Sequence, residues 1–208
     1  MKLISIEGNI GSGKSTFVNI LKAYYKDNNR VCFLDEPVDT WNTIVDDNGE
    51  TIIENYYRDQ KKYAFSFQMM AYISRLALLK RAIQNKEYDI IISERSLSTD
   101  KYVFCQMLYD DKIIDTINYS IYNKWFDEFN IDIKTQYVYL KTDPSIAYDR
   151  IQTRARKGEI IPLAYLTICD KYHNEWLKNK DVLELDANNN KEDKDVMNDW
   201  LDKVNTLL

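Results

Sequence analysis

The run Gly8-Asn9-Ile10-Gly11-Ser12-Gly13-Lys14-Ser15 decides the fold of this chain, because it fits the pattern GxxxxGK[ST] and lies between two regular elements. Residues 3–7 before it are mostly apolar, as in a short buried strand. Residues 14–26 after it carry apolar side chains at helical spacing. A strand, this loop and a helix in succession form the first unit of a parallel sheet. The sequence therefore predicts an α/β protein with the loop at the carboxyl end of its first strand.

The loop suits a chain of phosphates. Its glycines let backbone N–H groups converge on phosphate oxygens, in conformations that a side chain would resist. The helix that follows adds the positive end of its dipole. Lys14 supplies a point charge to the outer phosphates, and the Ser15 hydroxyl can hold Mg²⁺. We therefore expect residues 8–16, Thr16 included, to bind ATP or another nucleoside triphosphate with Mg²⁺. The alternative is a chance glycine-rich turn, and the flanking strand and helix count against it.

The rest of the chain repeats the alternation of strands and helices, without a linker or an internal repeat. We expect strands over residues 31–34, 89–93, 136–140 and 182–185, and helices over residues 63–85, from 97, from 113, from 143, over 162–178 and up to the C-terminus. Strands separated by helices form a parallel sheet that is covered on both faces. The sequence thus predicts a single domain over residues 1–208, with a five-stranded parallel sheet flanked by helices.

The composition narrows the possible partners. The chain has 208 residues, a formal net charge of −5 and a pI of about 5.1, whereas proteins that grip long nucleic acids usually present a basic face. The apolar run at the N-terminus is too short for a signal peptide or a membrane span. The three cysteines are far apart, which predicts reduced thiols. We therefore expect a cytoplasmic protein that binds neither nucleic acid nor membranes, with an organelle or a virus as its origin still open.

Charged side chains follow two of the expected strands. Glu36 follows the second strand, and Glu94 and Arg95 follow the third. The carboxyl ends of parallel strands face the ligand crevice, where Glu36 can accept the proton of an acceptor hydroxyl during phosphoryl transfer. Glu94 can help to hold Mg²⁺, and Arg95 can neutralise charge on the transferred group. The alternative for each residue is an ordinary solvated charge at a strand end. This alternative is less convincing when two such strand ends lie beside one phosphate loop.

A basic cluster follows the fourth expected strand. Arg150 and Arg154 share one face of a helix, with Arg156 nearby, and residues 157–159 break that helix. In an acidic protein this cluster suits a lid that closes on phosphates. The alternative is an exposed basic helix end, which the helix dipole would favour without any ligand.

The phosphate loop does not identify the class of protein, because switches, motors and kinases share it. A GTPase switch needs the strings DxxG and NKxD, and both occur here, at residues 46–49 and 190–193. The first string follows no convincing strand and indicates a surface turn. The second lies in an Asn-rich, charged stretch where such a match arises easily. A nucleotide-binding switch is therefore the weaker interpretation.

Further stretches match a known family. They are residues 4–22 around the loop, Glu36-Pro37-Val38 with Trp41, Phe65-Ser66-Phe67-Gln68 with Ser74-Arg75, Glu94-Arg95-Ser96 with Asp100, residues 150–156, and residues 161–166. In this order and over nearly the whole chain, they resemble the deoxyribonucleoside kinase family, in particular its deoxycytidine/deoxyguanosine kinase branch. The resemblance implies a P-loop kinase fold with an Arg-rich lid, phosphorylation of the 5′-hydroxyl of a deoxyribonucleoside by ATP in nucleotide salvage, and a homodimer built through helices that flank the active site.

The resemblance also implies residue roles. Glu36 is the general base on the 5′-hydroxyl, with Arg95 beside that oxygen, and the three arginines of the lid cover the ATP phosphates. The nucleoside is contacted by Tyr57 and Glu159 at the 3′-hydroxyl, by Trp41, Phe67 and Phe104 as walls of the base pocket, by Gln68 at the base edge, and by Arg75 with Asp100 as the charged pair that reads the base. The alternative for the aromatic residues is an ordinary hydrophobic core.

The pair Arg75 and Asp100 predicts the choice of base. Thymidine-accepting members resemble this chain less at these positions, and a charged pair leaves hydrogen-bonding demands that thymine does not meet. We therefore expect deoxycytidine and purine deoxynucleosides to be favoured over thymidine. The nearest rival is a nucleoside monophosphate kinase of the thymidylate kinase type. Asp35 counts against it, because a second carboxylate beside Glu36 suits a neutral hydroxyl better than a phosphate dianion.

Three positions depart from the family pattern or carry no role in it. The lid segment from Arg156 to Pro162 is one residue shorter than in similar members, which affects the assignment of Glu159. Lys191 stands where some members place an aromatic residue over the donor base. His173, the only histidine, lies on an expected helix, and we assign it no catalytic role.

Overall fold

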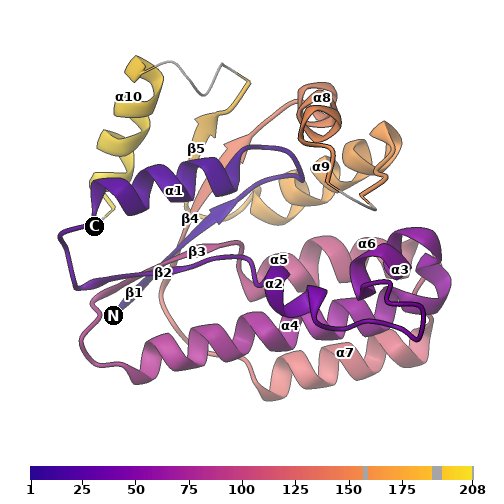
Figure 1. Ribbon diagram of the computed structural model, residues 1–208. Helices are drawn as coiled ribbons and strands as arrows, with labels where there is room; N and C mark the ends of the chain where they lie inside the picture. Colours follow the sequence, from indigo (N-terminus) through magenta and orange to yellow (C-terminus); the bar gives the residue numbers. More distant parts are fainter. Residues whose placement is uncertain (157–158, 189–193, 208) are drawn as a thin grey trace.

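A computed structural model describes residues 1–156, 159–188 and 194–207. Its centre is a parallel sheet of five strands in the order β2-β3-β1-β4-β5 (Figure 1). The strands are β1 (Lys2–Glu7), β2 (Val31–Leu34), β3 (Ile90–Glu94), β4 (Thr135–Lys141) and β5 (Val182–Asp186). The predicted α/β class and the parallel five-stranded sheet are confirmed, and the strand boundaries differ from the expected ones by one residue at most.

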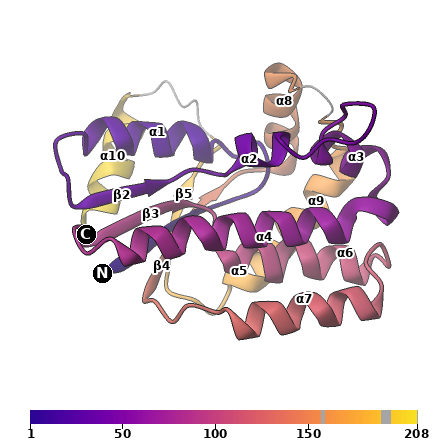
Figure 2. The same cartoon turned by 60° about the horizontal axis from the view of Figure 1, so that its bottom comes forward.

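The two faces of the sheet follow the two-residue period of β1. Ile4 and Ile6 point to one face and pack with α1 (Lys14–Tyr24) and α10 (Lys194–Asn205). Leu3 points to the other face, which is covered by α4 (Gln60–Gln84) and α7 (Thr116–Glu128). Figure 2 shows α4 and α7 side by side along that face. The sheet is therefore buried on both sides, as parallel sheets are.

The segment after β3 differs in part from the prediction. A helix begins at Leu97 as expected, and it runs through α5 (Leu97–Thr99), the π-helical η1 (Asp100–Cys105) and α6 (Gln106–Asp110). The next helix begins at Thr116 and not at Ile113. Ile114 is buried in the hydrophobic core, and the side chain of Asp115 accepts hydrogen bonds from the first turn of α7. The apolar residues before Asp115 predict helix by their pattern, but they belong to the preceding turn.

Two short helices after β2 escaped the sequence analysis. They are α2 (Val38–Asn42) and α3 (Ile52–Arg58), which are too short for helical periodicity to be visible. The start of α3 does carry a local signal, because Thr51 and Glu54 form a reciprocal capping box. The turn expected at residues 46–49 lies between the two helices.

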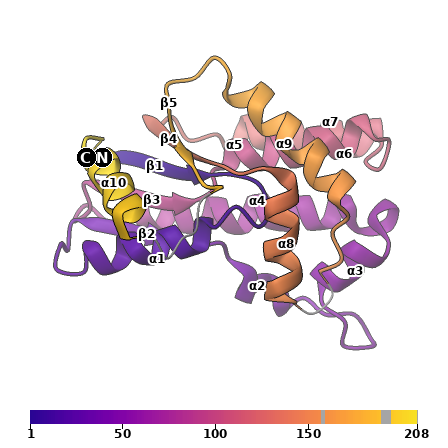
Figure 3. The same ribbon diagram turned by 90° about the horizontal axis from the view of Figure 1, so that it is seen from above.

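The remaining helices are α8 (Pro144–Arg154) and α9 (Leu163–Leu177), and α9 packs against β4 through the contacts of Tyr139 with His173 and of Tyr137 with Trp176. α8 begins with proline in its first turn, as predicted. It ends at Arg154, because Ala155 takes a left-handed conformation with φ 47°. The helix therefore ends before residues 157–159, where the sequence predicts its end. α9 follows it, and Figure 3 shows both helices on the side of the molecule that also holds α2 and α3. None of the helices within the described ranges combines the length and the apolar character needed to cross a bilayer.

Candidate active site

A cavity of about 640 Å³ opens at the carboxyl ends of β1, β2 and β3, a size typical of small-molecule sites. Most of the residues singled out in the sequence line it. They are Ile10, Gly11, Gly13, Lys14, Ser15, Thr16, Glu36, Trp41, Tyr57, Phe67, Gln68, Arg75, Glu94, Arg95, Asp100, Phe104, Arg150, Arg154, Arg156 and Glu159. Segments that are far apart in the chain therefore converge on one site.

The phosphate loop is shaped by groups that lie behind this lining. Gly8 has φ 148°, and a Cβ there would lie 2.8 Å from the carbonyl oxygen of Leu140, so the position excludes a side chain. The Asn9 amide donates a hydrogen bond to the carbonyl of Leu166, over 2.8 Å, and thereby fixes the loop to α9. Gly8, Asn9 and Ser12 thus shape the loop from behind, whereas Gly11, Gly13 and Lys14 face the cavity.

Lys14 is the cation at the centre of the loop. It is buried, and its ammonium group donates a hydrogen bond of 2.6 Å to the carbonyl of Asn9. Burial, with the nearby charge of Arg95, lowers the pKa of Lys14 to about 7. Negative charge placed beside this ammonium would therefore be strongly favoured, because it would offset the cost of burial.

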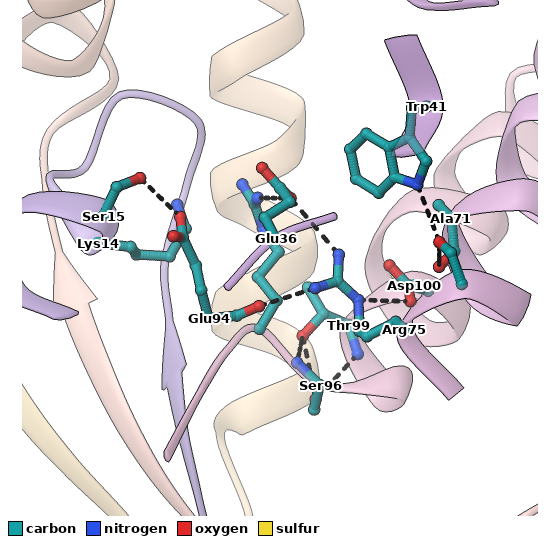
Figure 4. A network of polar contacts seen from close by, with 12 residues as sticks. Lys14, Ser15, Glu36, Trp41, Ala71, Arg75, Glu94, Ser96, Thr99 and Asp100 are labelled. Carbon is teal, nitrogen blue, oxygen red and sulfur yellow. Dashed lines mark hydrogen bonds and ion pairs between the residues drawn. The ribbon is translucent and has the colours of Figure 1, made fainter. Parts of the chain in front are cut away.

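Ser15 and Glu94 bring two oxygen ligands together beside the loop. The Ser15 hydroxyl donates to the Glu94 carboxylate over 2.9 Å, and Figure 4 shows the pair next to Lys14. A protein site for Mg²⁺ commonly supplies one or two oxygen ligands and leaves the rest to water and phosphate. The chemistry of this pair therefore fits the cation predicted from the sequence.

Glu36 lies between two arginines. Its carboxylate accepts hydrogen bonds from Arg95 over 2.6 Å and from Arg75 over 3.4 Å (Figure 4). Although burial alone would raise the pKa of this carboxyl group, the charges of Arg95 and Arg75 outweigh burial and lower it to about 2. Glu36 is therefore ionised at every physiological pH and presents a hydrogen-bond acceptor to the cavity.

Arg95 reaches the cavity through an unusual backbone conformation. Its φ of 64° is left-handed, a conformation that few residues with a side chain adopt and that costs free energy. Its guanidinium group lies 5.3 Å from the ring centre of Phe104. Within the described residues, its buried Nε has no hydrogen-bond partner. The strained backbone thus directs the Arg95 guanidinium group toward Glu36, and the Nε–H of this group stays available as a hydrogen-bond donor.

Arg75 and Asp100 form a buried ion pair, with 3.0 Å between Arg75 Nε and the carboxylate. Arg75 also donates to the carbonyl of Glu94 over 2.7 Å. Burial raises the pKa of Asp100, although Arg75 opposes this effect. The predicted pair is thus formed by α4 and the start of η1, and Arg75 connects it to Glu36 (Figure 4).

Comparison with known proteins agrees with this geometry. The family model described as deoxynucleoside kinase matches residues 4–208. The chain belongs to the deoxynucleoside kinase family. This kinase is therefore an enzyme, a phosphotransferase that phosphorylates nucleosides in nucleotide salvage. The interpretations as a monophosphate kinase or a nucleotide-binding switch are less well supported.

Several curated proteins are similar to this kinase. The probable deoxycytidine kinase of fowlpox virus (strain NVSL) is 39% identical over 181 residues, which cover 85% of this chain and 72% of the viral protein. The deoxycytidine kinase of Homo sapiens is 32% identical over 228 residues, 93% of this chain and 86% of the human one. The mitochondrial thymidine kinase 2 of Homo sapiens is 31% identical over 179 residues, which cover 84% of this chain and 64% of the human protein. The two human relatives are almost equally similar, so overall identity does not indicate the base.

The walls of the kinase cavity include residues that the sequence analysis missed. Tyr56 on α3 is buried, its hydroxyl lies 3.2 Å from that of Tyr165, and its ring centre lies 4.8 Å from that of Phe67. The indole of Trp41 donates to Ser74 over 2.9 Å. The capping box of α3 is the local signal that could have pointed to Tyr56, whereas Ser74 stood in a stretch that matches the family but was given no role.

Two further predictions, on Asp35 and His173, can be compared with the geometry. The Asp35 carboxylate forms an ion pair of 2.5 Å with Lys22 on α1, on the surface and outside the cavity lining. It therefore adds no charge to the acceptor side, and that argument against a monophosphate kinase was wrong. His173 is buried, and burial lowers its pKa to about 3, so it is a neutral packing residue outside the cavity lining. Lys191 lies outside the described residues.

The lid arginines and Glu159 all line the cavity. Arg154 forms an ion pair with Glu159, whose side chain is almost fully buried. Arg150 lies 3.5 Å from the carbonyl of Ser12 in the phosphate loop. Burial and then Glu159 raise the pKa of the Tyr57 hydroxyl well above its usual range, so this group stays a hydrogen-bond donor.

Proposed function

We propose that this kinase transfers the γ-phosphoryl group of ATP, with Mg²⁺, to the 5′-hydroxyl of a deoxyribonucleoside, and that it favours deoxycytidine and purine deoxynucleosides over thymidine. One observation carries the proposal. The acceptor Glu36 and the pair of Arg75 and Asp100 are joined through Arg75 in the cavity that also contains Lys14. A group that can accept a hydroxyl proton and a group that can read a base thus lie beside one phosphate loop.

The donor side is assigned to the loop and the lid. Lys14 and the backbone of residues 8–16 would hold the phosphates of ATP, with Ser15 and Glu94 at Mg²⁺ and Arg150, Arg154 and Arg156 over the outer phosphates. ATP supplies the phosphoryl group that is transferred, and Mg²⁺ when bound offsets the charge of the phosphates. The lowered pKa of Lys14 supports this assignment, because a buried ammonium gains most from an anionic partner.

On the acceptor side, Glu36 would receive the 5′-hydroxyl as a hydrogen-bond donor. A carboxylate with a pKa of about 2 is a weak base, so its main effect is to orient the hydroxyl, and it takes the proton late in the transfer. Phosphoryl transfer has a loose transition state that demands positioning more than proton removal. Arg95 then offsets the charge that develops on the transferred group. Tyr57 and Glu159 would hold the 3′-hydroxyl.

The base would lie between Trp41, Phe67 and Phe104, against two hydrogen-bond acceptors. One is the Asp100 carboxylate, and the other is Gln68 Oε1, which is buried and has no hydrogen-bond partner among the described residues. Cytosine and adenine present an amino group that donates to such acceptors, whereas thymine presents the O4 acceptor at the same edge. This mismatch supports the expected discrimination against thymidine.

Steady-state kinetics with the four natural deoxynucleosides tests the base preference. We expect kcat/KM for deoxycytidine to exceed that for thymidine by at least about tenfold, because two buried acceptors facing O4 would stay unpaired. At least one purine deoxynucleoside should also be a better substrate than thymidine. Thymidine as the best of the four substrates would refute the proposed reading of Arg75 and Asp100.

We also propose that the kinase is a homodimer. Four apolar side chains recur at four-residue steps on the outer face of α7. They are Ile117, Ile121, Trp125 and Phe129, and each is exposed by more than a third. Ile73 on the neighbouring α4 is 51% exposed as well. This apolar stripe is unusual for a monomer, and a second copy of the same face would cover it.

Sedimentation velocity tests the dimer. Wild type should sediment as a dimer, and the double variant Ile117→Glu/Ile121→Glu as a monomer, because four buried charges would face one another across a symmetric interface. The variant Ile44→Glu is a matched control, since Ile44 is similarly exposed but lies between α2 and α3. A monomeric wild type, or a double variant that stays dimeric, would exclude this interface.

The location of the kinase stays a prediction. Within the described residues, Cys32, Cys105 and Cys169 are free thiols, which is consistent with a reducing compartment. On this basis we propose the cytoplasm.

A further inference from the structure

Glu7 is a buried carboxylate that the mechanism above does not use. It is the last residue of β1 and directly precedes the phosphate loop. Its side chain is 0% exposed and, by the two-residue period of the strand, points to the same face as Leu3 and Ser5. Glu7 does not line the cavity, so it lies behind the site and is out of reach of a ligand.

The partners of this carboxylate are hydroxyl groups. Ser5 donates to it over 2.7 Å and Thr99 over 2.5 Å. Within the described residues, no lysine or arginine forms an ion pair with it. From a distance, Glu7 favours the charged forms of Lys14 and Arg75, but its direct contacts are hydroxyl groups. A neutral side chain of similar size would avoid the cost of burying a carboxylate without a contacting cation, so these direct contacts point to a further role of the glutamate.

Thr99 is the junction between Glu7 and the acceptor side. Its hydroxyl also accepts a hydrogen bond from the backbone N–H of Ser96, within the capping box that starts α5 (Figure 4). Arg95 precedes this box, and Asp100 follows it as the first residue of η1. The hydrogen bond from Thr99 to Glu7 therefore connects the phosphate loop to the segment that presents both acceptor-side groups.

A second tie lies on the other side of Arg95. The backbone N–H of Arg95 donates to the carbonyl of Ile6 over 3.0 Å, and Ile6 pairs with Glu94 in the sheet. Ile6 thus holds the backbone of Arg95, and the next residue of β1, Glu7, holds Thr99 four positions later. These two bonds support the left-handed backbone of Arg95, whose φ is 64°. The tie through Glu7 is the one made by side chains, so it can be removed without changing the strand.

We propose that Glu7, acting through Thr99, is a positioning residue that aligns the donor and acceptor halves of this kinase. Removing the tie should leave each half able to bind its own ligand while the two reacting groups are no longer aligned. A misplacement of about 1 Å can lower a rate about 100-fold. The loss is therefore expected in kcat and not in the affinity for either ligand.

The test uses Thr99→Val, which keeps the shape and removes the hydroxyl, with Thr99→Ser as the matched control that restores it. For Thr99→Val we expect kcat to fall by about 10–100-fold, and Kd for ATP and for deoxycytidine, each measured alone by calorimetry, to change by less than about threefold. Thr99→Ser should stay within about twofold of wild type. Glu7→Gln should lower kcat as well, because its single amide oxygen cannot accept from both Ser5 and Thr99. Thr99→Val also removes the acceptor of the Ser96 N–H, so its loss should be the larger of the two. Combining the two variants should add little to that loss, because both act on the tie between Glu7 and Thr99.

Three results would overturn the proposal. The first is a kcat within threefold of wild type in both Thr99→Val and Glu7→Gln. The second is a weaker affinity for one ligand with no change in kcat. The third is a double variant in which the two reductions of kcat multiply. If Glu7→Gln does not fold, the comparison of valine with serine at position 99 decides alone. The choice of ATP and deoxycytidine rests on the proposed function, so wild type is assayed first. An inactive wild type refutes that function, whereas an active wild type with unaffected variants refutes the role of Glu7.

Discussion

Replacing Glu36 with glutamine is expected to lower kcat by about 10²–10⁴-fold, because in the proposed transfer this carboxylate both orients the 5′-hydroxyl and receives its proton. Glutamine keeps the size of the side chain but removes the charge that, in the proposed mechanism, accepts the 5′-hydroxyl proton. It also leaves Arg95 and Arg75 without the carboxylate that they now share. The measurement is steady-state turnover with deoxycytidine and ATP, together with Kd for ATP, which should stay within about threefold because the phosphate loop is intact.

Asp35→Asn provides the matched control, because it removes a carboxylate from the neighbouring residue. Asp35 is exposed and paired with Lys22, so kcat should stay within about twofold of wild type, as for most exposed pairs. In wild type, protonation of Glu36 should not limit kcat/KM above about pH 4, since the arginines hold its pKa at about 2. Turnover retained in Glu36→Gln would remove this residue as the base.

The second large effect is expected at Asp100. Asp100→Asn should lower the ratio of kcat/KM for deoxycytidine to that for thymidine by about 10–100-fold, the equivalent of one hydrogen bond to a charged group. In the proposed complex the carboxylate would accept from the cytosine amino group, whereas the asparagine amide could also donate to thymine O4. Arg75 can donate a hydrogen bond to the aspartate carboxylate or to the amide oxygen of the asparagine. The replacement should therefore disturb the position of Arg75 little.

Asp127→Asn is the control for this experiment. Asp127 is exposed and pairs with Lys101, the residue next to Asp100, but it does not line the cavity. Its replacement should leave the ratio of the two substrates unchanged. If Asp100→Asn keeps the wild-type preference, the pair of Arg75 and Asp100 does not read the base.

The sheet and the phosphate loop could be predicted because their signals are local. Short apolar runs followed by helical periodicity marked each strand, and the loop pattern pointed to Lys14 and Ser15, which line the cavity. α2 and α3 could not be found in the same way, because five and seven residues are too few to show a period. With α3 missed, Tyr56 was missed as well.

The sequence predicts which residues belong to the acceptor side, but it does not predict where their side chains point. Glu36 and Asp35 are neighbours at one strand end, and nothing local shows that the first points into the cavity and the second toward Lys22. The left-handed backbone of Arg95 and the π-helical start of η1 depend on contacts with β1 and α4. The burial of Glu7 depends likewise on Thr99, which lies 92 positions away in the sequence.

The proposed phosphoryl transfer can be tested most directly by following the label of ATP that is radiolabelled in its γ-phosphate. The purified protein is incubated with this ATP and Mg²⁺, and with either deoxycytidine or deoxycytidine monophosphate, and the labelled products are separated. We predict label in deoxycytidine 5′-monophosphate from the nucleoside, and no labelled diphosphate from the monophosphate. Label in the diphosphate, or label released only as inorganic phosphate, would contradict the account.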